Sequence, residues 1–153
     1  MASIEPDDAW RAHLLKTSSE IRTLLEKTHR VAVLGIKPES HADRPAFYVP
    51  EYVQQAGLQV IPVPVYYPHV TTILGKPVFR SLREVPGSID LVDVFRRPEH
   101  IEQHVDDILA ARPRAVWFQS GIRHDVVAER LAREGIDVVQ DRCLMVELSR
   151  IGR

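Results

Sequence analysis

The sequence predicts an α/β fold of the Rossmann-like, doubly wound type, with a mainly parallel sheet between two layers of helices. Short apolar runs rich in β-branched residues alternate along the chain with segments whose apolar residues recur at helical spacing. The apolar runs are continuous, which is typical of parallel strands that are covered on both faces. Together these observations predict a three-layer α/β/α arrangement in a single domain.

The overall composition is that of an ordinary globular protein. Of the 153 residues, 44% are hydrophobic and 27% are charged, and the formal net charge is −1. This balance provides no reason to expect nucleic acid or an anionic membrane as a partner. The single cysteine, Cys143, excludes an internal disulfide and suits a reducing cytoplasm. Because there is no signal-peptide pattern and no apolar run near the roughly 20 residues that span a bilayer, we expect a cytoplasmic protein.

The N-terminal part is expected to be helical. Between Asp7 and Thr28, apolar residues recur at helical intervals, which predicts one or two amphipathic helices with a break near Ser18. We therefore divide the chain into a helical segment, residues 1–29, that packs on a Rossmann-like domain, residues 30–153.

The first predicted strand leads into a loop suited to an anion. Four apolar residues precede Gly35, so residues 30–35 are expected to form a buried strand that turns sharply at the glycine. Lys37 and Arg44 follow in the loop, and a helix is expected over 49–56. Because helix N-termini present unpaired N–H groups, this order of elements predicts an anion site.

The remaining predicted elements continue the alternation of strands and helices. Prolines in the second strand are expected to end it near Ile61 or Val63, because proline cannot donate to the ladder. In chain order, we expect that strand from residue 59, then a short strand or an extended connection at residues 78–79 in an irregular stretch, and a helical turn over 81–87. Further strands are expected over 89–95, 114–119 and 136–139, and further helices over 98–111, 124–134 and 141–149.

Five motifs follow one another in the order found in a known family. They are VAVLG followed by DRP, the IPV segment, DVFRRPE, VWFQSGI and VVQDRC. Through these motifs the chain, from Val31 to Glu147, resembles the stand-alone CoA-binding proteins of the YccU-like family, which share the Rossmann-like CoA-binding domain of succinyl-CoA synthetase alpha subunits. The resemblance implies a CoA or acyl-CoA ligand. The chain departs from the family pattern at Ala46, where a serine is common, and at Pro64-Val65, where Asn-Pro is usual.

The residues expected to bind CoA follow the predicted strands, because ligands of doubly wound sheets bind beyond the carboxyl ends of the strands. The backbone N–H groups from Gly35 to Lys37, with the Arg44 side chain, are expected to bind the diphosphate. The segment from Val63 to Val65, with Phe95, is expected to form an apolar slot for the adenine. The candidate CoA-binding residues are Gly35, Ile36, Lys37, Ser40, Arg44, Pro45, Tyr48, Pro62, Val63, Pro64, Val65, Phe95, Arg96, Arg97 and Gln119.

Several of these residues have alternative roles. Arg96 and Arg97 are expected to contact a phosphate or the adenine face, or instead to cap a carbonyl or pair with Asp93. Gln119 is either a ligand contact or a partner for backbone groups at the end of the sheet. The two cations of the first loop are phosphate contacts or solvated surface charges.

The leading functional prediction is a CoA-binding module with no catalytic or metal-binding residues and no indicated protein partner. An NAD(P)-dependent oxidoreductase is the first alternative, although Gly35 is not part of a G-x-G-x-x-G fingerprint. A CoA-dependent acyl-transfer enzyme that uses Cys143 is the second, although the sequence places no base beside the thiol. The histidines lack the paired spacing of a zinc site.

Overall fold

One parallel sheet forms the centre of the molecule. The computed structural model describes residues 6–153, so residues 1–5 of the predicted N-terminal segment lie outside the described residues. The sheet has five strands in the order β2-β1-β5-β6-β7, and all neighbouring strands are parallel. The strands are β1 (Arg30–Leu34), β2 (Gln59–Val63), β5 (Leu91–Val94), β6 (Ala115–Phe118) and β7 (Asp137–Val139).

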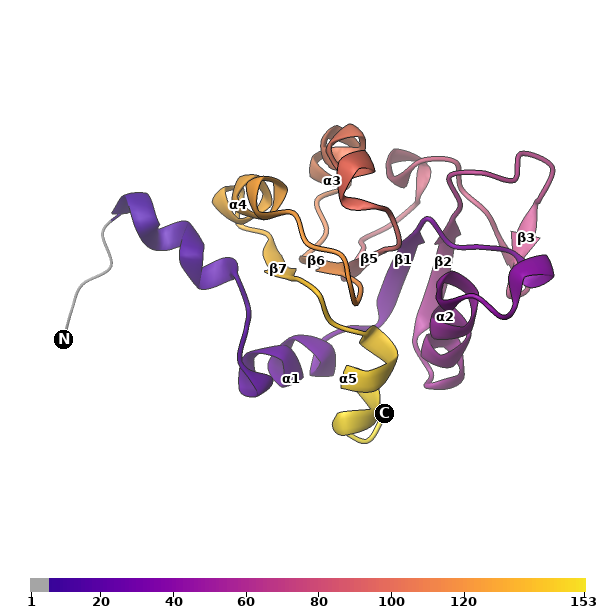
Figure 1. Ribbon diagram of the computed structural model, residues 1–153, viewed down its shortest axis with the longest axis horizontal. Helices are drawn as coiled ribbons and strands as arrows, with labels where there is room; N and C mark the ends of the chain where they lie inside the picture. Colours follow the sequence, from indigo (N-terminus) through magenta and orange to yellow (C-terminus); the bar gives the residue numbers. More distant parts are fainter. Residues whose placement is uncertain (1–5) are drawn as a thin grey trace.

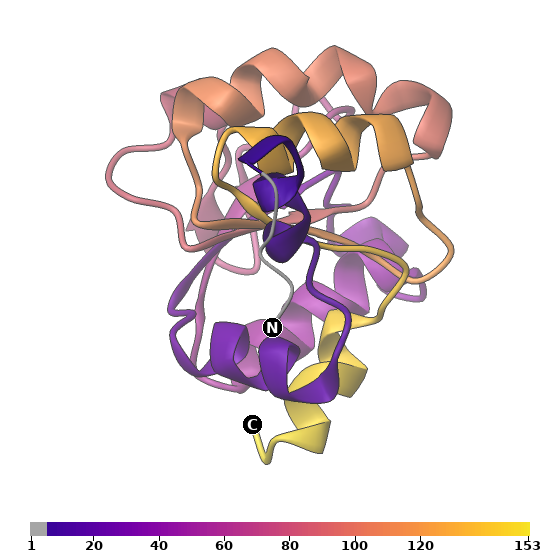
Figure 2. The ribbon, with the colours of Figure 1, turned by 90° about the vertical axis from the view of Figure 1, so that its left-hand side faces the viewer.

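Helices cover both faces of the sheet. They are α1 (Ser18–Glu26), α2 (Pro45–Gln55), α3 (Val105–Ala111), α4 (Asp125–Arg133) and α5 (Leu144–Arg150). Helices α3 and α4 lie on one face, and α1, α2 and α5 lie on the other (Figure 1, Figure 2). Side chains alternate between the two cores, so Val92 packs with α3 and α4 while Leu91 packs with the opposite layer. The structure confirms the predicted doubly wound α/β/α fold.

The direction of the crossovers reverses between β1 and β5. The chain leaves β1 through α2 on one face of the sheet, and it leaves β5 through α3 on the other face. The loops that follow these two adjacent strands therefore separate at the carboxyl edge. In doubly wound sheets a ligand crevice forms at this point.

The connection between β2 and β5 differs from the prediction. Instead of a strand at residues 78–79, a hairpin forms from β3 (Thr72–Ile73) and β4 (Lys76–Pro77). Its two turn residues, Leu74 and Gly75, both have positive φ, as type I′ hairpin turns require. Of the two alternatives at residues 78–79, the strand does not form, and these residues are a connection that follows β4. The hairpin was not predicted because leucine at the first turn position is not a turn signal.

Some helix boundaries also differ from the prediction. α2 begins at Pro45 rather than at residue 49, because proline at the first helical position has a suitable φ and no N–H to satisfy. The predicted helix over 98–111 starts as 3-10 turns and becomes α-helical only at Val105. The last helix begins at Leu144 rather than at Asp141, whose φ of 56° is not helical.

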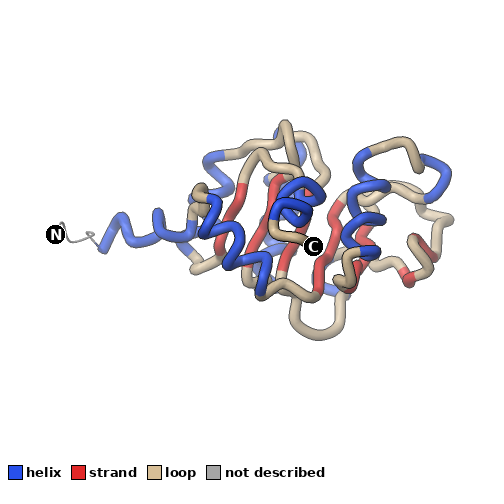
Figure 3. The backbone as a smooth tube through the Cα atoms, turned by 90° about the horizontal axis from the view of Figure 1, so that it is seen from below, coloured by secondary structure: helices blue, strands red, loops and turns tan. Residues whose placement is uncertain are grey.

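The N-terminal segment lies along the edge strand β7. Its first element, Pro6–His13, is a 3-10 helix where an amphipathic α-helix was predicted. The Leu15 N–H donates to the Val138 carbonyl at 2.9 Å, and His13 Nδ1 lies 2.7 Å from Asp137 Oδ1. These contacts protect the edge of β7 from pairing with another chain. In Figure 3 this segment and the β3–β4 hairpin lie at opposite ends of the sheet. The boundary between residues 1–29 and 30–153 stays a prediction.

Candidate functional site

A cavity of about 670 Å³ opens at the carboxyl edge of the sheet. It is surrounded by the loop after β1, the start of α2, the loops after β5 and β6, and the start of α5. The structure thus brings together segments that are far apart in the sequence. The predicted CoA-binding residues that line this cavity are Lys37, Arg44, Pro45, Tyr48, Phe95, Arg96, Arg97 and Gln119.

The loop after β1 is attached to the first turn of α2. Pro50 lies inside α2 and has no N–H, so the carbonyl of Ala46 is free of its usual helical partner. The Lys37 N–H donates to this carbonyl at 3.1 Å. A proline that interrupts the helix ladder therefore helps to hold Lys37 at the cavity.

Gly35 has a role that was not predicted. Its φ of 87° confirms the sharp turn, but a Cβ at this position would collide with the carbonyl oxygen of Phe95. The Gly35 N–H donates to the Val63 carbonyl at 2.9 Å. The N–H groups of Gly35 and Lys37 both donate to carbonyls of the protein, and the role of this loop in binding a diphosphate stays a prediction. The glycine allows close approach to β5.

Arg96 is a buried cation whose position is set by neutral partners. Its Nε donates to His104 Nε2 at 3.1 Å, and its Nη1 donates to the hydroxyl of Tyr66 at 3.3 Å. The hydrogen bond and charge of Arg96 lower the pKa of Tyr66. Burial, followed by the charge of Arg96, lowers the pKa of His104, so the imidazole is neutral and can accept. Arg96 therefore keeps its positive charge without a neutralising carboxylate.

Four cations surround one side of the cavity without a protein counter-ion. They are Lys37, Arg44, Arg96 and Arg97. Within residues 6–153, no carboxylate lies within ion-pair distance of any of them. A local concentration of positive charge on a protein of net charge −1 favours an anionic ligand at this place.

Asp93 and Gln119 form a buried pair next to the cavity. Asp93 lies within β5 and is fully buried, and Gln119 Nε2 donates to its Oδ1 at 2.7 Å. Burial raises the pKa of Asp93 to about 7, although the hydrogen bond from Gln119 opposes this change. Asp93 Oδ2 has no partner among the described residues. The structure thus pairs Asp93 with Gln119, and the alternative that it pairs with Arg96 or Arg97 is wrong.

Other predicted residues lie outside this cavity. Val63 is buried in the core, and Ser40 is exposed, with its hydroxyl 3.0 Å from His41 Nδ1. Pro64 and Val65 line a smaller cavity of about 260 Å³ on the α3 side. The predicted adenine slot of Val63, Val65 and Phe95 is therefore divided, because Val63 and Val65 belong to the core on the α3 side and Phe95 packs against the core on the other face. Also outside the larger cavity are Gly35, Ile36 and Pro62.

The sequence analysis missed several residues that line the larger cavity. Cys143 and Met145, from the start of α5, lie there although neither is among the candidate CoA-binding residues. They follow β7, so the rule that ligands bind beyond strand ends would have included them. The other missed lining residues are Ala46, Val49, Pro98, Ser120, Gly121 and Ile122.

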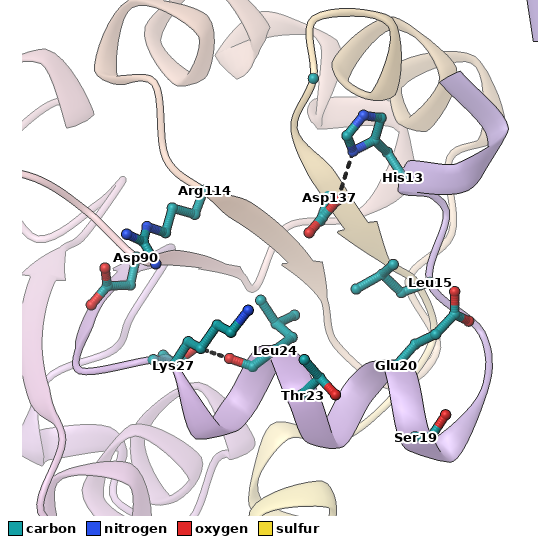
Figure 4. A pocket seen from close by; sticks show the side chains of 12 residues that line it. His13, Leu15, Ser19, Glu20, Thr23, Leu24, Lys27, Asp90, Arg114 and Asp137 are labelled. Atoms are coloured by element: carbon teal, nitrogen blue, oxygen red, sulfur yellow. Dashed lines mark hydrogen bonds and ion pairs between the residues drawn. The ribbon is translucent and has the colours of Figure 1, made fainter. Parts of the chain in front are cut away.

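A different cavity, of about 540 Å³, lies at the amino ends of the strands, between α1 and the sheet (Figure 4). Several of the charged groups there are engaged within the protein. His13 pairs with Asp137, and Asp90 Oδ2 accepts from the N–H groups of His29 and Arg30 at 2.9 Å each. We assign the functional site to the carboxyl-edge cavity because it gathers four cations at the strand ends where ligands of doubly wound sheets bind.

Two further observations concern the residues 6–153 that the structure describes. They contain no group of three or more His, Cys, Asp or Glu side chains arranged to hold a metal ion. None of their helices combines the length and the apolar character needed to cross a membrane.

Comparisons with known proteins give the family. The CoA binding domain family matches residues 29–149. The uncharacterized protein YneT of Bacillus subtilis (strain 168) is 32% identical over 130 residues, which cover 85% of this chain and 93% of YneT. A solved protein from Thermus thermophilus is 39% identical, with a TM-score of 0.81 over 89% of this chain and 99% of its own. A hypothetical protein from Pyrococcus horikoshii OT3 is 26% identical, with a TM-score of 0.79 over 99% of each chain.

The family match agrees with the order of the motifs in the sequence. It spans residues 29–149, from just before β1 to the end of α5, and includes every loop at the carboxyl-edge cavity. The resemblance that the motifs predicted is confirmed, and the chain belongs to the CoA-binding domain family.

Proposed function

We propose that this protein binds CoA or an acyl-CoA in the carboxyl-edge cavity and does no chemistry on it. The observation that carries the proposal is the cavity itself, which has four cations without carboxylate partners in the loops after the adjacent strands β1 and β5, and uncharged residues in the loops after β6 and β7. CoA likewise has a charged part and an uncharged part, because its phosphates lie on the nucleotide and its pantetheine arm is uncharged. Membership of a CoA-binding family supports the same ligand.

The phosphates of CoA are expected to lie beside Lys37, Arg44, Arg96 and Arg97. Arginine and lysine both bind phosphate through charge-assisted hydrogen bonds, and arginine can do so with two N–H groups. Arg96 is the most rigid of the four because His104 and Tyr66 already hold it. We propose that the flexible cations close around the phosphates while Arg96 provides a fixed point.

The lining of the cavity argues against catalysis. It includes Cys143 but no histidine, aspartate or glutamate, so the thiol has no general base among the lining residues. We therefore place CoA binding ahead of acyl transfer. Intact-mass analysis after incubation with an acyl-CoA tests this choice, because a stable acyl adduct on Cys143 would contradict a purely binding role.

CoA is expected to raise the melting temperature. A ligand that binds only the folded state adds RT ln(1 + [L]/Kd) to stability, about 2.7 kcal/mol at a hundredfold excess over Kd. For a chain of this size, that corresponds to a rise of roughly 5–10 °C. Differential scanning fluorimetry with CoA and with NAD measures the effect. A rise with NAD and none with CoA would contradict the proposal.

Replacing Arg44 with alanine is expected to weaken CoA binding about 10- to 100-fold, the cost of losing one charge-assisted contact. Its side chain is exposed at the start of α2, so the fold should be preserved. Arg22→Ala, on α1, is the matched control because it removes an exposed arginine outside the cavity. Titration calorimetry at two salt concentrations measures both variants. If Arg44→Ala and Arg22→Ala bind CoA with equal affinity, Arg44 is not part of the phosphate site.

We also propose a cytoplasmic location and a small-molecule partner, CoA, as the single cysteine and the family indicate.

A further inference from the structure

The carboxamide of Gln119 is bonded to the protein through one side only. Its Nε2 donates to Asp93, whereas its Oε1 accepts no hydrogen bond from the described residues. The side chain lines the cavity, and Oε1 is not among the enclosed polar atoms that lack a partner. The oxygen is therefore not fully enclosed, and it is an acceptor without a partner among the described residues, on a side chain that lines the cavity.

Asp93 determines which end of the carboxamide faces the cavity. Above pH 7 the Asp93 carboxyl is ionised and can only accept hydrogen bonds, so it must receive the NH₂ group of Gln119. Reversing the carboxamide would place its oxygen against a carboxylate oxygen. Both side chains extend from the same face of adjacent parallel strands, because Asp93 pairs in register with Trp117, two residues before Gln119. The nearby Trp117 Nε1 donates elsewhere, to the Arg142 carbonyl at 2.8 Å.

The side of the cavity that contains Gln119 has no charged lining residue. Gln119, Ser120, Gly121 and Ile122 follow β6, and Cys143 and Met145 come from the start of α5. The four cations lie on the other side, near the start of α2 and the end of β5. If the phosphates of CoA lie at the cations, the uncharged pantetheine arm extends toward Gln119. That arm contains two amide groups, each with an N–H donor.

We infer that Gln119 Oε1 accepts a hydrogen bond from an amide N–H of the pantetheine arm, and that Asp93 is the positioning residue that keeps this oxygen toward the ligand. This inference rests on the proposed function. It assigns to the buried pair a role in distinguishing CoA from nucleotides that have the same phosphates but no pantetheine arm.

The test compares CoA with 3′-phospho-ADP, which is CoA without its pantetheine arm. Gln119→Met keeps a side chain of similar length but removes the acceptor, and we expect it to weaken CoA binding about 3- to 10-fold. Its affinity for 3′-phospho-ADP should stay within about twofold of the parent, because that ligand lacks the amides. Titration calorimetry measures both ligands, and circular dichroism checks that the variant is folded.

The double variant tests the part assigned to Asp93. Asp93→Asn removes the constraint, because an asparagine can either accept from or donate to Gln119. We expect a smaller loss of CoA affinity than in Gln119→Met, again without an effect on 3′-phospho-ADP. Combining the two substitutions should add no further loss, since Asp93 acts through Gln119. A purely structural effect of Asp93 would add to that of Gln119→Met and would overturn its positioning role.

Other outcomes separate the inference from the proposed function. If the parent binds both ligands and Gln119→Met keeps its full preference for CoA, the inference fails while the proposed function holds. An equal loss for both ligands would also overturn the inference, because Gln119 would then act on the nucleotide. If the parent binds neither ligand, the proposed function itself is wrong.

Discussion

Replacing Asp93 with asparagine is expected to remove a large loss of folding stability that occurs in the parent protein as the pH rises toward 7. The Asp93 carboxyl is fully buried, and its pKa is raised from 3.8 to about 7 in the folded protein. The unfolded chain loses this proton near pH 4, whereas the folded protein retains it until near pH 7. Between these values the folded state binds more protons, so stability falls as pH rises.

The effect should be large because it extends over several pH units. Each unit of difference in pKa corresponds to about 1.4 kcal/mol, so the carboxyl should cost roughly 3 kcal/mol between pH 5 and pH 7. The asparagine of Asp93→Asn has no proton to lose in this range. The free energy of unfolding of the variant, relative to that of the parent, should therefore increase by about that amount from pH 5 to pH 7. Urea denaturation at pH 5, 6, 7 and 8 measures the difference.

A matched control isolates the contribution of burial. Asp106→Asn changes the same functional group on α3, but that carboxylate is exposed to solvent. Its stability difference from the parent should change little over the same pH range, because exposure is similar in the folded and unfolded chains. If the difference in unfolding free energy between Asp93→Asn and the parent is also constant with pH, burial does not raise the pKa of Asp93.

Gly35→Ala is expected to destabilise the protein by about 3 kcal/mol or more. The added Cβ would collide with the carbonyl of Phe95, and both groups belong to the backbone of adjacent strand ends. Neither can rotate away as a side chain can. The positive φ of 87° adds the strain of a left-handed conformation in a residue with a Cβ.

Gly57→Ala is the control for the backbone strain alone. Gly57 has a φ of 95°, but no atom lies within 4 Å of the position that its Cβ would occupy. We expect this substitution to cost about 1–2 kcal/mol. Chemical denaturation of the two variants separates the collision from the strain. If both variants lose the same stability, the close approach of Gly35 to Phe95 does not contribute.

The sequence by itself determined the layered fold and the edge of the sheet where ligand residues gather. Continuous apolar runs such as Val31–Leu34 indicate strands buried on both faces, and the helical segments between them require parallel crossovers. The order of the motifs was sufficient to predict a CoA-binding family. These features depend on local residue patterns and on the order of elements along the chain, and both can be read from the sequence.

Only the tertiary structure decided which strand-end residues share a cavity. Phe95 lies in the larger cavity and Val65 in the smaller one, although both follow strands that end at the same edge. Val65 packs against the core on the α3 side of the sheet, whereas Phe95 packs against the core on the opposite side. Likewise, the buried contact of Asp93 with Gln119 depends on the register between β5 and β6. Such pairings join residues far apart in the chain, so no local pattern of residues encodes them.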